Sequence, residues 1–218
     1  MNKNCTELVF VLDRSGSMSG LEEDTIGGFN AMLKKQKAVR GEALVTTVLF
    51  DNEYEVLHNR ENIRNVRPLT PKDYYVRGST ALLDAVGRTI NRIGKAHAYE
   101  AEENRPGKVL FVIITDGMEN ASCEFGWHTV KKMIEHQKNK YRWEFIYLGA
   151  NIDAAAEAAR VGIAADRAAN YHADARGTAL NYAVVSEQIS CMRSGAPIDP
   201  RWKEAIDNDY KSRKKRKC

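Results

Sequence analysis

Short runs of apolar residues alternate along the chain with longer segments in which apolar side chains recur every three or four positions. Runs that are apolar throughout are typical of parallel strands buried on both faces of a sheet. The longer segments have the spacing of amphipathic helices. The pattern predicts an α/β fold with a doubly wound, mostly parallel central sheet and helices on both faces. The strands are expected at residues 8–12, 44–50, 109–114 and 145–148.

A fifth expected strand, residues 54–57, differs from these four. It follows the second apolar run after Asp51-Asn52-Glu53, which is typical of a tight turn, so it is predicted to be an antiparallel edge strand. Helical spacing covers further segments, and Asp153 and Gly162 provide a start and a stop for one of them. The expected helices span residues 21–39, 81–98, 127–138, 152–161, 178–192 and 202–210.

Length and composition favour a single globular domain. The chain has 218 residues, of which 43% are hydrophobic and 28% are charged, which is ordinary for a folded protein of this size. The sequence contains neither an internal repeat nor a low-complexity segment. We expect one domain over residues 1–194 and a C-terminal extension over residues 195–218 that ends in a basic tail.

The net charge of +4 comes from this tail. Residues 211–217 contain six Lys and Arg side chains and no acid. The rest of the chain contains 27 basic and 29 acidic residues and so has a net charge of −2. Such a segment is typical of a solvated terminus, and the functional alternative is a salt-sensitive contact with nucleic acid or another polyanion. Without interleaved aromatic residues, stacking on single-stranded bases is not expected.

Targeting features favour the cytoplasm. No apolar stretch reaches the roughly 20 residues of a membrane-spanning helix, and the first residues lack the charged and then apolar pattern of a secretory leader. We therefore expect a cytoplasmic protein without membrane contact. The cysteines are too scattered for a zinc or redox motif and are expected to be free thiols. They are Cys5, Cys123, Cys191 and Cys218.

Oxygen-bearing side chains gather directly after the first expected strand. Asp13 ends the apolar run of residues 8–12, and Ser15 and Ser17 follow at alternate positions. One carboxylate and two hydroxyls without a soft ligand suit a hard divalent cation. A simpler interpretation is that Asp13 and Ser15 only cap the following helix.

Two other segments repeat this pattern. Thr80 lies just before the second expected helix, and Asp116 follows the expected strand at residues 109–114. Because the carboxyl ends of parallel strands meet at one edge of a sheet, we expect Asp13 and Asp116 to lie close together. Neighbouring carboxylates repel each other unless a cation lies between them. Mg²⁺ fits such a site, since it binds through one or two carboxylates and keeps water in its other positions; Mn²⁺ is an alternative.

Three motifs carry a resemblance to a known family. They are Asp13-x-Ser15-x-Ser17-Met18, Gly78-Ser79-Thr80-Ala81-Leu82 and Ile114-Thr115-Asp116-Gly117. In this order they resemble the von Willebrand factor A (VWA) domain with its metal-ion-dependent adhesion site (MIDAS), over about residues 6–194. The resemblance implies a Rossmann-like VWA fold and a metal site made of Asp13, Ser15, Ser17, Thr80 and Asp116.

The resemblance also implies a role for each ligand. Ser15 and Ser17 would bind the ion directly, and Asp13 would bind it directly or through water. Thr80 and Asp116 would exchange direct and water-mediated roles when a partner binds. In the family, an acidic residue of the partner typically takes the last coordination position.

Side chains around the three motifs are candidates for the rim of the site. Arg14 is expected either in solvent or as a positive charge that selects an acidic ligand. The other candidates are Tyr74, Tyr75, Arg77, Met118, Glu119, Asn120 and Trp127. For Trp127, packing at the start of a helix is favoured over a role at the rim.

By this resemblance, the chain is expected to be a non-catalytic module that binds an exposed Asp or Glu of a protein partner through Mg²⁺. The first alternative is a Mg²⁺-dependent phosphatase or phosphotransferase, because an Asp at a strand end also opens such sites. Ser15, however, stands where the haloacid dehalogenase type has a second Asp, and a phosphate-binding glycine loop and a nucleophile elbow are lacking. The second alternative is polyanion or nucleic-acid binding through residues 211–217.

Overall fold

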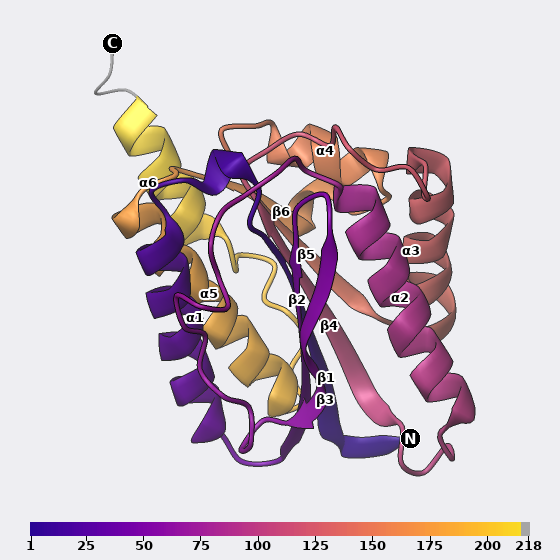
Figure 1. Ribbon diagram of the computed structural model, residues 1–218. Helices are drawn as coiled ribbons and strands as arrows, with labels where there is room; N and C mark the ends of the chain where they lie inside the picture. The colour runs from indigo at the N-terminus through magenta and orange to yellow at the C-terminus, as the bar shows by residue number, and fades with distance from the viewer. Residues whose placement is uncertain (215–218) are drawn as a thin grey trace.

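The computed structural model describes residues 1–214, with a six-stranded sheet between two layers of helices (Figure 1). The strands are β1 (Asn2–Asp13), β2 (Glu42–Phe50), β3 (Tyr54–Asn62), β4 (Pro106–Thr115), β5 (Glu144–Ala150) and β6 (Ala168–Tyr171). The helices are α1 (Glu22–Lys37), α2 (Leu82–Tyr99), α3 (Trp127–Tyr141), α4 (Ala154–Arg160), α5 (Ala175–Arg193) and α6 (Glu204–Lys214). Short 3-10 helices occupy Gly16–Met18 (η1) and Ala165–Arg167 (η2).

The strands lie in the order β3-β2-β1-β4-β5-β6. Neighbouring strands are parallel except β2 and β3, which pair antiparallel across the turn at residues 51–53. This confirms the predicted mostly parallel sheet with one antiparallel edge strand. Strand β6 was not predicted, because Ala168-Ala169-Asn170-Tyr171 lacks a run of strong strand formers. Its pairing with β5 and its contact with α6 hold it in the sheet.

Alternate residues of β1 point to opposite faces of the sheet and fill two hydrophobic cores. Leu8, Phe10 and Leu12 pack in a core with α1, α5 and α6. Val9 and Val11 pack in a second core with α2, α3 and α4. Figure 1 shows these two groups of helices on opposite sides of the sheet. Burial on both faces explains why the β1 sequence is apolar throughout.

The order of the strands reverses between β1 and β4. Strands β2 and β3 lie on one side of β1, and β4, β5 and β6 lie on the other. In open α/β sheets, such a reversal opens a crevice at the carboxyl ends of the strands, because the connections leave in opposite directions. Asp13 is the last residue of β1 and Asp116 follows β4 directly. The topology therefore places both carboxylates at this crevice.

The connection from β3 to α2 returns along the sheet to the same crevice without regular secondary structure (Figure 1). Asn30 of α1 holds it through Leu69: Asn30 Nδ2 donates to the Leu69 carbonyl at 2.9 Å, and Leu69 N donates to Asn30 Oδ1 at 2.8 Å. Lys37 Nζ donates to the Val66 carbonyl at 2.7 Å. Helix α1 thus positions the segment that carries Thr80.

The C-terminal extension packs against the core that α1 and α5 share. Trp202 and Ile206 are 4% and 1% exposed and belong to this core. The Trp202 indole donates from Nε1 to the Asp166 carbonyl at 2.7 Å. The boundary between residues 194 and 195 stays a prediction, but residues on both sides of it contribute to one hydrophobic core.

The first basic residues of the predicted tail belong to α6, which extends beyond the expected end at Tyr210. Arg213 forms ion pairs with Asp209, at 3.0 Å, and with Asp174. The charge of this arginine is therefore already compensated within the fold. The remainder of the tail, residues 215–218, lies outside the described residues.

Two other expectations concern the cysteines and membrane-spanning helices. Cys5, Cys123 and Cys191 are free thiols, as expected. In the part of the chain that the structure describes, no helix is long and apolar enough to cross a membrane. The cytoplasmic location stays a prediction.

Two adjacent glycines of α1 provide a matched test of its packing on α5. A Cβ on Gly28 would lie 2.3 Å from the Tyr182 ring, whereas a Cβ on Gly27 meets nothing within 4 Å. We expect Gly28→Ala to lower the free energy of unfolding by about 1–3 kcal/mol, because the buried ring must move. Gly27→Ala should raise it by about 0.5–1 kcal/mol, because alanine favours the helix. Urea denaturation followed by circular dichroism measures both, and equal effects would contradict the close approach of α1 and α5.

Candidate metal centre

A chain of hydrogen-bonded side chains joins the three sequence motifs. Ser17 Oγ donates to Asp116 Oδ1 at 2.6 Å, and the hydroxyls of Ser15 and Ser17 lie 3.0 Å apart. Thr80 Oγ1 donates to Ser15 Oγ at 3.0 Å. The two serines come from the segment after β1, Thr80 from the segment before α2 and Asp116 from the segment after β4. Four of the five predicted ligands are thus in direct contact.

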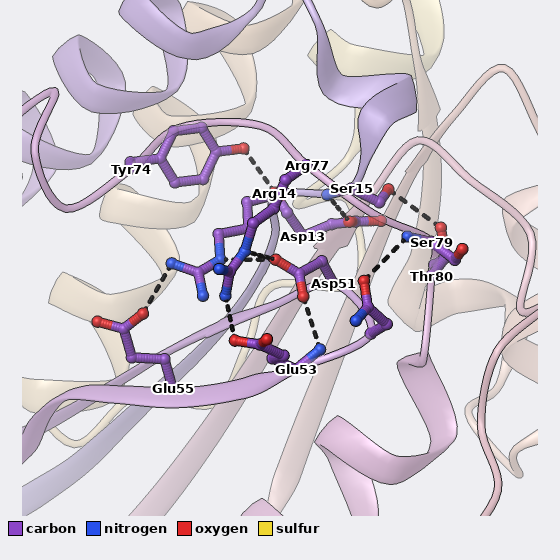
Figure 2. A network of polar contacts seen from close by, with 11 residues as sticks. Asp13, Arg14, Ser15, Asp51, Glu53, Glu55, Tyr74, Arg77, Ser79 and Thr80 are labelled. Carbon is purple, nitrogen blue, oxygen red and sulfur yellow. Dashed lines mark hydrogen bonds and ion pairs between the residues drawn. The ribbon is translucent and has the colours of Figure 1, made fainter.

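Asp13 is the fifth predicted ligand, and its carboxylate is held by neighbouring residues. Oδ1 accepts a hydrogen bond from Ser15 N at 2.7 Å, and Oδ2 accepts one from Thr115 Oγ1 at 2.5 Å. The hydroxyl of Tyr74, from the β3–α2 connection, donates to the Asp13 backbone carbonyl at 2.5 Å (Figure 2). These bonds fix the carboxylate of Asp13 at the end of β1.

Asp116 has one oxygen without a donor. Its Oδ1 accepts from Ser17, whereas Oδ2 is buried and has no hydrogen-bond partner among the described residues. Beside it, a Cβ on Gly117 would lie 2.9 Å from Thr80 Oγ1 and 3.0 Å from Ser17 Oγ. The glycine therefore keeps the space between these two hydroxyls free of a side chain. A buried carboxylate oxygen is costly unless a donor or a cation contacts it, so this arrangement fits a bound cation.

Burial makes the two carboxylates unfavourable as free anions. It raises the pKa of Asp13 to about 6, although the hydrogen bonds from Thr115 and Ser15 lower it. Burial also raises the pKa of Asp116. Within residues 1–214, no Lys, Arg or His forms an ion pair with either carboxylate.

The raised pKa of Asp13 makes the stability of the fold depend on pH. A carboxyl group whose pKa is raised by folding contributes stability below its unfolded pKa, near 4, and loses that stability as the pH rises through about 6. In the metal-free protein at neutral pH, the ionised Asp13 therefore opposes folding. A divalent cation between Asp13 and Asp116 would balance both charges.

A separate buried ion pair joins the neighbouring loops (Figure 2). Asp51, which follows β2 and is fully buried, accepts from Arg14 Nε at 3.1 Å and from Arg77 Nε at 2.7 Å. Arg14 is itself fully buried and also forms an ion pair with Glu55 at 2.8 Å. The expectation that Arg14 lies in solvent is wrong: its guanidinium is inside the fold, and two carboxylates balance its charge.

Backbone hydrogen bonds link the same loops. Gly16 N donates to the Gly78 carbonyl at 3.1 Å, and Ala81 N donates to the Asp51 carbonyl at 2.9 Å. Gly78 has a φ of +66°, and a Cβ there would lie 1.9 Å from Asn52 Oδ1, so only glycine fits. The segments that carry Ser15 and Thr80 are therefore fixed against the turn between β2 and β3.

The loop after β4 is attached to the beginning of α2. Thr80 N donates to Asn120 Oδ1 at 3.0 Å, and Asn120 N donates to the Thr80 carbonyl at 3.0 Å. The carboxylate of Asp84, in the first turn of α2, accepts from the backbone N–H groups of residues 123–125 at 2.8–3.0 Å. The segments that carry Thr80 and Asp116 are thus held by one hydrogen-bond network.

Among the predicted rim residues, two expose a large apolar surface. Tyr75 is 44% exposed and Met118 is 63% exposed. Tyr74 is buried and supports Asp13, and the Trp127 ring packs under the Arg160 guanidinium, 3.5 Å from the ring centroid. The remaining candidates, Arg77, Glu119 and Asn120, form hydrogen bonds that hold the loops.

Asp51 and Thr115 are not among the predicted ligands or rim residues, although both belong to this region. For Asp51 a signal exists, because it follows the apolar run of residues 44–50 as Asp13 follows its own. Thr115 has no such signal, because its hydroxyl contacts Asp13 only through the pairing of β1 with β4.

No protein-family model and no curated protein matches the sequence. Solved structures do match. Proximal thread matrix protein 1 from the mussel byssus gives a TM-score of 0.56 at 12% identity, over 88% of this chain and 47% of that chain. A von Willebrand factor type A protein from Catenulispora acidiphila gives a TM-score of 0.56 at 12% identity, over 86% of this chain and 42% of that chain. The pilus adhesin SpaC from Lactobacillus rhamnosus GG gives a TM-score of 0.66 at 11% identity, over 87% of this chain and 31% of that chain.

These similarities establish the fold. The chain has the von Willebrand factor A fold, as the three motifs implied. It spans less than half the length of each of these proteins. One solved form of the mussel protein has zinc in its MIDAS motif.

The buried ion pair at Asp51 can be tested with a matched variant. Asp51→Ala should lower the free energy of unfolding by about 3–5 kcal/mol, because it leaves the Arg14 guanidinium buried without its main partner. Glu55→Gln is the control: this side chain is 48% exposed, so we expect a loss below about 1 kcal/mol. Chemical denaturation of the purified variants gives both values. A small loss for Asp51→Ala would mean that the ion pair does not hold the loops.

Proposed function

The chain has the von Willebrand factor A fold, and on that premise we propose that it is a non-catalytic, divalent-metal-dependent protein-binding module. It binds Mg²⁺, or Mn²⁺ as an alternative, and through this ion an exposed Asp or Glu of a protein partner. The observation that carries the proposal is the Asp116 carboxylate: its Oδ1 accepts from Ser17, which contacts Ser15, while its Oδ2 is buried without a hydrogen-bond partner among the described residues.

The proposed ligands are Asp13, Ser15, Ser17, Thr80 and Asp116. The two carboxylates match the charge of one divalent ion, and the described residues offer no group of three or more Asp, Glu, His or Cys side chains that could hold a metal ion. The hydroxyls therefore supply the other protein contacts. Hard oxygen ligands in this number suit Mg²⁺, which keeps water in its remaining positions. When bound, the ion supplies an electrophilic position that a carboxylate oxygen of another protein can occupy.

The surface around the loops supports a protein as the ligand. Tyr75 and Met118 expose apolar surface on the segments next to Thr80 and Asp116. Tyrosine and methionine are enriched where proteins contact each other. A partner segment with one acidic residue and apolar neighbours would match this arrangement.

The contacts of the serine hydroxyls favour binding over catalysis. A nucleophilic serine needs a neighbouring base. In the described residues, the hydroxyls of Ser15 and Ser17 contact each other, Thr80 and Asp116, and neither contacts a His or Lys. Mg²⁺-dependent release of phosphate from a phosphate monoester, lost in Asp13→Asn, would favour the phosphatase alternative.

Polyanion binding through residues 211–217 is the second alternative. Arg213 already pairs with Asp174 and Asp209, which reduces the positive charge that this segment offers. Retention on DNA and RNA at low salt, compared with and without residues 211–218, distinguishes this alternative from binding through the metal.

Metal binding is tested with two serines of the same loop. Ser17 Oγ bonds to Asp116, whereas Ser19 is exposed. After treatment with EDTA, the chain should bind Mg²⁺ and show a higher melting temperature with it. We expect Ser17→Ala to weaken the affinity by about 10-fold or more and Ser19→Ala to leave it within about 2-fold. Calorimetric titration with MgCl₂ and MnCl₂ measures this, and a wild-type chain that binds neither metal would refute the proposal.

Partner binding should depend on the metal in the same way. A pull-down from the source cell is expected to capture a protein in Mg²⁺ and to lose it in EDTA and with Asp116→Ala. Glu23→Ala, which removes an exposed carboxylate of α1, is the control and should retain the partner. Replacing exposed Asp and Glu residues of the captured protein one at a time should identify a single essential carboxylate. Capture that is equal in Mg²⁺ and EDTA would contradict a metal-mediated contact.

A further inference from the structure

A buried histidine outside the metal centre has no hydrogen-bond partner among the described residues. His58, on β3, is 1% exposed, and both of its ring nitrogens are unpaired. Thr47 lies opposite His58 in the pairing of β2 with β3. This threonine is fully buried, and its Oγ1 is also unpaired in the part of the chain that the structure describes. Buried polar groups are almost always paired, so the fold carries a cost at this position.

His58 faces the segment that follows β3, residues 63–74, which we call the cover segment. Directly opposed residues of an antiparallel pair lie on the same face of a sheet. Val45 and Leu49, on either side of Thr47, belong to the core shared with α1, α5 and α6. Thr47 and His58 therefore point to that side of the sheet. The cover segment contributes four buried side chains to the same core: Ile63, Val66, Leu69 and Tyr74.

The charged groups around His58 do not compensate for its burial. They are Glu61 of β3 and, on the cover segment, Arg67 and Asp73. Arg67 and Asp73 pair with each other at 2.8 and 2.9 Å, so their charges cancel. From α1, the ammonium of Lys37 donates to a carbonyl of the cover segment at 2.7 Å and adds a positive charge. Burial lowers the pKa of the His58 ring, although the two carboxylates and the Arg67 backbone raise it, so the ring is neutral at pH 7.

The cover segment supports the metal centre. Tyr74, at its end, donates to the Asp13 carbonyl at 2.5 Å (Figure 2). Three residues further on, Arg77 N donates to the Arg14 carbonyl at 2.9 Å. The cover segment has no helix or strand of its own, and α1 holds it through the hydrogen bonds of Asn30 and Lys37. Loosening the cover segment therefore removes support from the loop that carries Asp13.

We propose that His58 is an acid-sensitive switch: its protonation opens the cover segment and weakens the metal centre, so that the module releases its metal ion in acid. A histidine that is exposed in the open state titrates near pH 6.5. Because the closed state disfavours the proton, its stability is complete above that pH and falls as the pH drops below it. Release of the ion rests on the proposed function, whereas opening of the cover segment does not.

Hydrogen exchange measures opening of the cover segment directly. The metal-free full chain is compared at pH 7.5 and pH 5 by mass spectrometry, with rates corrected for the intrinsic effect of pH. We expect the protection of residues 63–74 to fall by about 10-fold or more at pH 5. Protonation of Asp13 stabilises the metal-free fold over the same pH range, so it works against this loss and cannot produce it.

Two variants assign the loss of protection to His58. His58→Leu keeps a buried side chain of similar size without a titrating group, so the protection should change by less than about 2-fold. His128→Gln, at an exposed position of α3, should behave as the wild type. An NMR titration of the wild-type ring protons needs no variant, and His58 should stay neutral well below the pH at which His128 titrates. Equal loss of protection in the wild type and His58→Leu, or coincident titration of the two histidines, would overturn the proposal.

The effect on the metal centre is measured by calorimetric titration with MgCl₂ at pH 7.5 and pH 5.5. Protonation of Asp13 lowers the affinity of the wild type and of His58→Leu alike. We expect the wild type to lose about 5-fold more affinity than this variant, because only its cover segment opens. An equal loss in both chains would overturn the link to the metal centre. A chain that binds no Mg²⁺ at either pH would refute the proposed function, while the exchange experiment would still decide the role of His58.

Discussion

Three neighbouring strands, β2, β1 and β4, lead into a buried aspartate at the same edge of the sheet, and only one of the three carboxylates has cationic partners among the described residues. Asp51 lies between Arg14 and Arg77. Asp13 and Asp116 have hydroxyl and backbone donors but no cationic partner in residues 1–214. Removing a carboxylate from water is costly unless a positive charge accompanies it. The paired aspartate fixes the loops, and the two unpaired ones create the negative potential on which the proposed metal site depends.

Much of this arrangement could be predicted from local sequence. Continuous apolar runs identified β1, β2, β4 and β5, because burial on both faces leaves no polar alternation. The VWA fold followed from three short motifs in order. Strand β6 could not be found this way, since its four residues are held by β5 and α6 rather than by their own preference.

The buried state of Arg14 could not be predicted from its neighbours either. Arginine is rarely buried without a partner, and the partner here, Asp51, lies 37 positions away in the sequence. The same limit applies to Tyr74, which is 61 positions from the Asp13 carbonyl to which it donates. The five ligand candidates lie on motifs that a sequence displays, whereas the residues that hold them are joined only by the topology.

The end of the chain protects the outermost parallel strand. Strand β6 has β5 on one side only, and α6 packs against it. Lys203 Nζ donates to the carbonyl oxygens of Ala165 and Ala168, at 2.7 and 2.6 Å. An uncovered strand edge is a template for pairing with another chain. A protein shortened after α5 would expose both this strand edge and the apolar surface on which Trp202 packs, and would be prone to aggregate through them.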